Sequence, residues 1–291
     1  MAPPAGYKHR ELAHASETTV VRGIRRSLRE MIRSGSSMFC DFREGGVAGA
    51  RAFSAARRGI GIGGLVLGRP AALRYDREEL DALLGLCDGV AVSAVSDWEH
   101  PELEKVSAHV RSAGKMFALH ASEVVREDID KVLLLKPRFL VHMVKAEEYD
   151  LERVAAEGVP IVVCPRANAL FGLRPRIDLM RGFGVEVALG SDNAMLQPPE
   201  MLPVVQSAWE TVRGSGMKPH DILDLAIGGF RKILNLPERM PFTPGMLAEF
   251  FVVGNPRMYS AGDPAAELVR HGGTAKVVLA SAKGRIWRRR Q

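Results

Sequence analysis

The sequence predicts an α/β protein of the TIM (β/α)8-barrel type, and three observations support this prediction. Short apolar runs, typical of strands that are buried on both faces, recur along the chain. Their starts lie 22 to 27 residues apart, which is the length of one strand, one helix and two loops. All seven runs end in polar or charged residues, and a barrel collects such residues at the carboxyl ends of its strands. An open doubly wound sheet would instead place its ligand mainly at one switch point.

The predicted elements follow one another in a regular order. A first helix is expected over residues 16–33, with Ser16 as its N-cap and Gly35 as its stop. The seven strands are expected to start near Ser37, Ile62, Gly89, Met116, Arg138, Pro160 and Val185. Glycines at or just before these starts supply the left-handed residue at which a preceding helix can end. The spacing and the glycines therefore predict the same repeat.

Beyond Asp192 the repeat changes. Helical segments are expected over residues 203–212 and 220–234. From Phe242 the chain becomes rich in short apolar runs, at residues 250–253 and 274–279, which predict a few strands. We therefore expect residues 1–240 to form the barrel domain and residues 241–291 a small β-rich accessory segment.

Composition limits the classes of partner. The 291 residues are 46% hydrophobic and 25% charged, as in ordinary globular proteins. No run approaches the roughly 18 apolar residues of a membrane span, and the first residues lack the apolar core of a signal peptide, so we expect a cytoplasmic protein without a membrane partner. The net charge is +6, but the basic residues are scattered except in a short terminal cluster, so we expect no nucleic-acid partner.

Metal-ligating residue types follow three of the predicted strands. His120, His142 and Asp192 each come at the end of a buried run. The carboxyl ends of parallel strands collect functional groups, and imidazole nitrogens with carboxylate oxygens are a ligand set that zinc accepts. Glu123, at the start of the next helix, can either reach the same site or favour the helix N-terminus. These residues predict a metal site.

An ordered series of motifs carries a resemblance to a known family. The motifs are His120-Ala-Ser-Glu123, Leu140-Val-His142, Val163-Cys-Pro-Arg-Ala-Asn168 with Leu170 and Gly172, Leu189-Gly-Ser-Asp192-Asn193, and Thr243-Pro-Gly245 followed by Ala248-Glu-Phe-Phe-Val-Val253. This series resembles the amidohydrolase superfamily, in its cytosine-deaminase and aminohydrolase-like branch. The resemblance extends over most of the chain, from about residue 8 to residue 285.

The resemblance implies a metal-dependent hydrolase of non-peptide carbon–nitrogen bonds, of the deaminase or cyclic-amide and amidine type. It implies one divalent metal, zinc or iron, with His120 and Asp192 among its ligands. His142 matches the histidine that polarises the substrate or stabilises the tetrahedral intermediate, and Glu123 matches the carboxylate that moves protons. The metal lowers the pKa of water toward about 7, and Asp192 or Glu123 takes the proton. The expected partner is a small molecule with an amidine or amide group.

Further residues are candidates for substrate contact. Asp41, Arg43 and Glu44 follow the first predicted strand, where they can either contact a substrate or form ion pairs with one another. Asn168 lies in one of the matched motifs and is expected to bind substrate.

One family motif is missing from the sequence. The resemblance implies a His-x-His pair on strand one of the barrel, and no His-x-His occurs in these 291 residues. We therefore expect strand one to be absent, either because the sequence starts downstream of the real start or because this is a natural short form. Such a barrel exposes two strand edges, which another segment or a second copy of the chain can cover, and it holds its metal weakly.

Two other functions are compatible with the same fold. A non-catalytic barrel, or a truncated form, would bind a small molecule or a partner without metal, and an Asp192→Asn substitution would not affect it. A metal-free barrel lyase or isomerase would need a phosphate-binding glycine loop after strand seven or eight, and Leu189-Gly-Ser-Asp192 is a poor match to one.

Overall fold

A computed structural model describes residues 6–237, 244–245 and 248–288 of the chain. Thr243, in the last matched motif, lies outside these described residues. The chain divides into two compact units, described here one after the other. The first unit holds Met1–Leu28, Phe39–Ile60 and Gly64–Val159, and the second holds Arg29–Met38, Gly61–Gly63 and Pro160–Gln291. Each element that crosses a boundary lies mostly in the first unit.

Strands and helices alternate along the first unit. Its elements are α1 (Tyr7–His14), α2 (Glu17–Arg33), β1 (Met38–Arg43), α3 (Gly46–Arg57), β2 (Gly63–Gly68), α4 (Arg77–Leu86), β3 (Gly89–Val92), the 3-10 turn η1 (Val95–Asp97), α5 (His100–Ser112), β4 (Met116–Ala121), α6 (Ile129–Leu134), β5 (Phe139–His142) and α7 (Glu148–Ala156). Helix α2 begins where the sequence predicts, because the Thr19 N–H donates to the Ser16 hydroxyl oxygen over 3.2 Å. Gly35, just after its end, has a φ of +97°.

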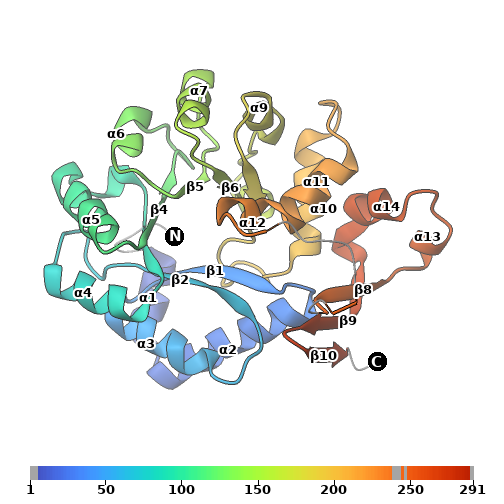
Figure 1. The fold of residues 1–291 in the computed structure, drawn as a ribbon, viewed down its shortest axis with the longest axis horizontal. Helices are drawn as coiled ribbons and strands as arrows, with labels where there is room; N and C mark the ends of the chain where they lie inside the picture. Colours follow the sequence, from blue (N-terminus) through green and yellow to red (C-terminus); the bar gives the residue numbers. More distant parts are fainter. Residues whose placement is uncertain (1–5, 238–243, 246–247, 289–291) are drawn as a thin grey trace. The chain divides into compact units, whose positions relative to one another are not determined.

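The strands of the first unit pair in chain order, β1-β2-β3-β4-β5. Strands β2 to β5 pair in parallel, with Gly89 opposite Met116 and Ala121 opposite His142. Figure 1 shows helices α4 to α7 along the outer side of these strands. Val90 and Leu119 are fully buried, as expected of strands covered on both faces. A Cβ atom on Gly89 would lie only 2.1 Å from the Met116 carbonyl oxygen, so the close approach of β3 and β4 requires glycine there.

The second unit begins with two more parallel strands and continues into helices and a small sheet. Its elements are β6 (Ile161–Val163), α8 (Pro165–Leu170), α9 (Ile177–Gly182), β7 (Val187–Leu189), α10 (Met201–Val212), α11 (Pro219–Ile227), α12 (Gly229–Ile233), β8 (Phe250–Gly254), α13 (Pro256–Tyr259), α14 (Pro264–His271), the 3-10 turn η2 (Gly272–Thr274), β9 (Lys276–Ala282) and β10 (Arg285–Arg288). Strands β6 and β7 pair in parallel, with Val163 opposite Leu189. The seven strand positions predicted from the sequence are therefore confirmed.

The C-terminal strands form an antiparallel sheet in the order β10-β9-β8. Strands β9 and β10 are joined by Lys283 and Gly284, which both have positive φ angles, as tight hairpins require. Leu202 of α10 and Leu268 of α14 pack with Val277 and Ala280 of β9 in one buried cluster. The predicted strands at residues 250–253 and 274–279 are confirmed as β8 and β9. Helices α13 and α14 lie between them in the sequence and were not predicted. The division at residue 240 stays a prediction.

Among the helices in the described part of the chain, none combines the length and the hydropathy needed to cross a lipid bilayer.

Candidate active site

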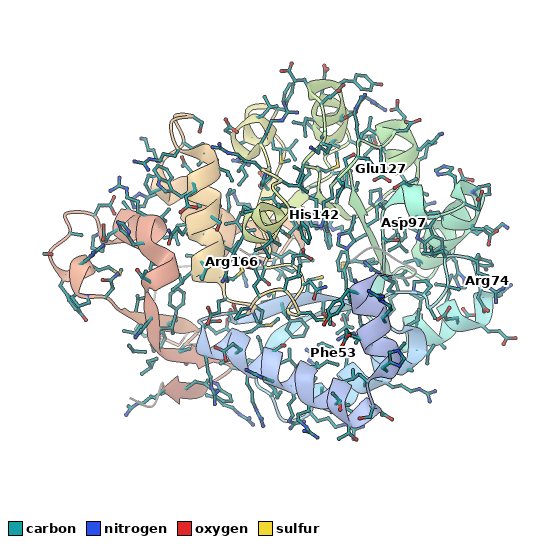
Figure 2. All side chains as sticks on the ribbon, turned by 180° about the vertical axis from the view of Figure 1, so that it is seen from behind. Phe53, Arg74, Asp97, Glu127, His142 and Arg166 are labelled. Atoms are coloured by element: carbon teal, nitrogen blue, oxygen red, sulfur yellow. The ribbon has the colours of Figure 1, made fainter. Side chains whose placement is uncertain are left out.

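Two histidines and a carboxylate meet at the carboxyl ends of β4 and β5 in the first unit. The His120 and His142 rings stack with centroids 5.1 Å apart and planes 25° apart. The Nε2 atom of His142 lies 3.5 Å from the Glu123 Oε2 atom, and the His142 side chain is only 2% exposed. His142, labelled in Figure 2, lies at the end of β5. The structure thus brings together three of the residues that the sequence singled out.

The backbone at these strand ends adopts an uncommon conformation. His142 and Met143 have φ angles of +77° and +51°, a left-handed region that costs free energy for residues other than glycine. Two hydrogen bonds hold this turn: the Met143 N–H donates to the Ala121 carbonyl and the Lys145 N–H to the Ser122 carbonyl, over 2.9 and 2.8 Å. The turn fixes the direction in which the His142 ring leaves β5.

The environment of His120 favours a neutral imidazole. Burial lowers its pKa well below 6.5, and the neighbouring positive or ionisable groups of His142, Arg69 and Lys8 lower it further. A neutral ring keeps a nitrogen lone pair, which is the form that binds a metal ion. The donor chemistry of His120 therefore fits a divalent metal.

An aromatic ring packs against this histidine. Phe42 of β1 meets the His120 ring edge-on, with centroids 5.1 Å apart, and lies 6.0 Å from the Phe139 ring of β5. Apolar neighbours of this kind lower the local dielectric and strengthen electrostatic interactions at the histidine.

Glu44 lies just beyond β1, between two cations. Its Oε1 atom pairs with Nζ of Lys8 in α1 and with Nη1 of Arg69, which follows β2. The chain turns at once after Glu44, through Gly45 with a φ of +89°. A Cβ atom on Gly49 would lie 1.8 Å from the Glu44 carbonyl oxygen, so this turn needs glycine at both positions. Since Lys8 and Arg69 both influence His120, Glu44 belongs to the surroundings of that ring.

The side chains of Asp41 and Arg43 lie on the face of β1 opposite to Phe42. Side chains alternate along a strand, so both share a face with Phe39, whose ring lies 5.5 Å from Phe53 of α3. The Arg43 Nη1 and Asp41 Oδ2 atoms are 3.6 Å apart, which confirms the ion pair. Burial raises the pKa of Asp41, while Arg43 opposes that shift. A role in substrate contact for this pair stays a prediction.

A buried glutamate joins the two loops that follow β3 and β4. Glu127 accepts hydrogen bonds from the Ser96 N–H at 2.7 Å and from the Ser122 N–H at 3.0 Å, one on each carboxylate oxygen. Figure 2 labels Glu127 and Asp97, which mark these neighbouring loops. Lys8, Arg69 and Glu127 are site residues that the sequence analysis missed. Each of these residues contacts a partner in a different element. Only one signal in the sequence pointed to them, the polar residues at the ends of the predicted strands.

The remaining predicted residues belong to the second unit. Asn168 is fully buried in α8, where its N–H donates to the Cys164 carbonyl over 2.9 Å and its carbonyl accepts the N–H of Leu173. Asp192, half-buried just after β7, has a φ of +58°. Like His142, it is a non-glycine residue held in the left-handed region at a strand end, and such conformations are frequent at functional sites.

Several curated proteins are similar in sequence. An uncharacterised protein of Methanocaldococcus jannaschii is 29% identical over 254 residues, which are 80% of this chain and 65% of the relative. A protein of Archaeoglobus fulgidus named "Putative aminohydrolase" is 37% identical over 202 residues, 68% of this chain and 57% of the relative. A protein of the same name from Methanothermobacter thermautotrophicus is 26% identical over 310 residues, 99% of this chain and 79% of the relative. The chain thus spans less than two thirds of the first two relatives. No protein-family model matches the chain.

Solved structures share the fold. An adenosine deaminase from Xanthomonas campestris with bound zinc superposes with a TM-score of 0.77 at 19% identity, covering 95% of this chain and 71% of the other. A zinc complex of atrazine chlorohydrolase from Arthrobacter aurescens gives a TM-score of 0.74 at 16% identity, covering 95% and 73%. The chain belongs to the amidohydrolase superfamily. The barrel-type fold predicted from the sequence is confirmed.

Proposed function

We propose that the chain is the barrel portion of a metal-dependent hydrolase that cleaves non-peptide carbon–nitrogen bonds in small molecules. The observation that carries this proposal is the meeting of His120, His142 and Glu123 at adjacent strand ends. The relatives named as aminohydrolases and the deaminase among the solved structures support the same reaction class.

The proposed metal ligands are His120 and Asp192. His120 supports this assignment through its neutral imidazole, and Asp192 is assigned on the family resemblance. A divalent metal held there, zinc or iron, would lower the pKa of a water molecule toward 7. Zinc is the metal named with both structural neighbours.

The proton steps are assigned to Glu123 and His142. Glu123, half-buried, takes a proton from the attacking water and delivers it to the nitrogen that leaves. His142, buried beside it, donates a hydrogen bond to the negative charge that develops at the attacked carbon. The 3.5 Å contact between the two side chains lets the proton positions on one influence the other.

Substrate recognition is assigned to Glu44, with Asp41, Arg43 and Asn168 as further predicted contacts. The Glu44 carboxylate can accept N–H groups of an amidine or amide, and Lys8 and Arg69 hold it in place. We propose a small-molecule substrate, a cytoplasmic location and self-association as the means of covering open strand edges.

Ammonia release is the test of this function. The purified chain, supplied with equimolar zinc, would be incubated with cytosine, adenosine and hydantoin, and ammonia release and ring opening would be followed. We expect turnover of at least one amidine or cyclic amide. Zinc-loaded protein that turns over none of these compounds would favour the non-catalytic barrel.

A further inference from the structure

We infer that Glu127 is a positioning residue that sets the geometry of Glu123, the residue that follows Ser122. This inference rests on the proposed hydrolase function. It concerns one buried carboxylate and the two loops that it joins, after β3 and after β4.

The first observation is a closed set of hydrogen bonds. The Glu127 carboxylate accepts the Ser122 N–H at 3.0 Å, and in return the Glu127 N–H donates to the Ser122 hydroxyl oxygen at 3.1 Å. Both residues are buried, with 8% and 2% of their surface exposed. The segment between Ser122 and Glu127, which includes Glu123, is therefore closed at both ends.

The second observation is the conformation of Ser122. Its φ of +48° is left-handed, and it sits directly between Ala121, the last residue of β4, and Glu123. A non-glycine residue stays in this region only where its surroundings impose it. The reciprocal hydrogen bonds with Glu127 supply that constraint and so determine where Glu123 leaves the strand.

The third observation concerns the charged neighbours of Glu127. Within the described residues, no nitrogen of a lysine, arginine or histidine lies within 4.0 Å of its carboxylate. The adjacent Arg126 turns instead to Asp150 of α7, over 2.7 Å. The Glu127 carboxylate accepts backbone N–H groups from two loops, as expected of a carboxylate that fixes loop geometry.

The second oxygen of Glu127 extends the constraint to a neighbouring loop. It accepts the Ser96 N–H, in η1 after β3, at 2.7 Å. The loop after β4, which contains Glu123, is thus hydrogen-bonded to the loop after β3. A displacement of about 1 Å at a reacting group can cost on the order of 100-fold in rate, so a glutamate outside the reaction can control it.

The test compares Glu127→Gln with Asp128→Asn, the matched control. Asp128 is the next residue, also carries a carboxylate that caps backbone N–H groups, and is 54% exposed. An amide at position 127 offers only one acceptor oxygen to two N–H donors. We expect kcat of Glu127→Gln to fall about 10- to 100-fold with KM within about threefold. For Asp128→Asn we expect both constants within about twofold of the wild type.

Hydrogen exchange at the Ser96 and Ser122 amides provides a readout that needs no substrate. We expect faster exchange at one or both amides in Glu127→Gln and unchanged exchange in Asp128→Asn. Unchanged kcat and unchanged exchange in a folded Glu127→Gln protein would overturn the inference. An inactive wild type would count against the proposed function instead, and the exchange rates would then decide whether Glu127 fixes these loops.

Discussion

At the scale of single residues, the contact between Glu123 and His142 concerns the proposed chemistry most directly. The His142 Nε2 and Glu123 Oε2 atoms are 3.5 Å apart, which is longer than a strong charge-assisted hydrogen bond. Catalytic contacts are often long in the absence of substrate and shorten in the complex.

Replacing Glu123 by glutamine tests the proton carrier. The amide keeps the size of the side chain but cannot accept and return a proton, so we expect kcat to fall about 100- to 10,000-fold with little change in thermal stability. Glu148→Gln, an exposed change in the first turn of α7, is the control. Steady-state kinetics of ammonia release would measure both. Activity of Glu123→Gln within tenfold of the wild type would rule out this role.

At the scale of elements, helix α7 is fixed to the loop after β4 by a buried carboxylate. Asp150 accepts hydrogen bonds from Arg126 Nε and Nη2 over 2.7 and 2.8 Å, and from the Glu147 N–H over 2.8 Å. Burial raises the pKa of Asp150, but these hydrogen bonds outweigh burial and hold the pKa below its ordinary value. The same carboxylate completes the capping box of α7.

This pair gives the stability of the protein an acid dependence. Because the pKa of Asp150 is lower in the folded state, its contribution is complete above its ordinary pKa of 3.8 and is lost as the pH falls through the folded value. We expect Asp150→Asn to lower the free energy of unfolding at pH 7 by about 1.5 to 3 kcal/mol, and by less below pH 3.8. Urea unfolding at several pH values would measure this difference.

The control for Asp150 is Asp130→Asn. Asp130 pairs with Arg153 over 3.0 Å at an exposed position, where ion pairs contribute about 0 to 1 kcal/mol. A pH-independent effect of Asp150→Asn, or an equal effect of Asp130→Asn, would contradict the account of α7.

At the scale of the whole molecule, a resident metal would couple binding to folding. A ligand that binds only the folded state, present at 100 times its Kd, stabilises it by about 2.7 kcal/mol, which corresponds to roughly 4 to 5 °C in Tm for a chain of this size. We expect zinc to raise Tm by this amount and chelators to reverse the shift. His120→Ala should abolish the response, and His220→Ala, at an exposed position of α11, should keep it. An equal zinc response in both variants would remove His120 from the ligand set.

Much of this fold could be predicted from the sequence, because buried parallel strands produce continuous apolar runs. Strands β3 and β4 begin at the predicted residues, Gly89 and Met116, since glycine and polar residues precede each run. Helices α13 and α14 could not be predicted in the same way. Pro256 and Pro264 resemble breaks in a β-rich region, although proline also favours the first turn of a helix.

The site was predicted only where its members lie at the ends of strands. His120, Glu123 and His142 come together because β4 and β5 are neighbours in both sequence and sheet. Lys8 and Arg69 could not be found in this way, since they reach Glu44 across 36 and 25 residues of sequence. The sequence also does not show which face of β1 meets α3. It therefore could not predict that Asp41 lies on the same face as Phe39, which packs against that helix.

The register of β4 and β5 has a consequence for how this protein can diversify. His120 and His142 belong to the sheet, whose neighbouring strands fix them, whereas Val124 and Val125 in the loop just beyond Glu123 are 66% and 58% exposed. Substitutions of Val124 and Val125 therefore leave the strand positions of His120 and His142 unchanged. The sheet thus holds the two histidines of the candidate site, while the exposed valines beside them are free to vary in sequence.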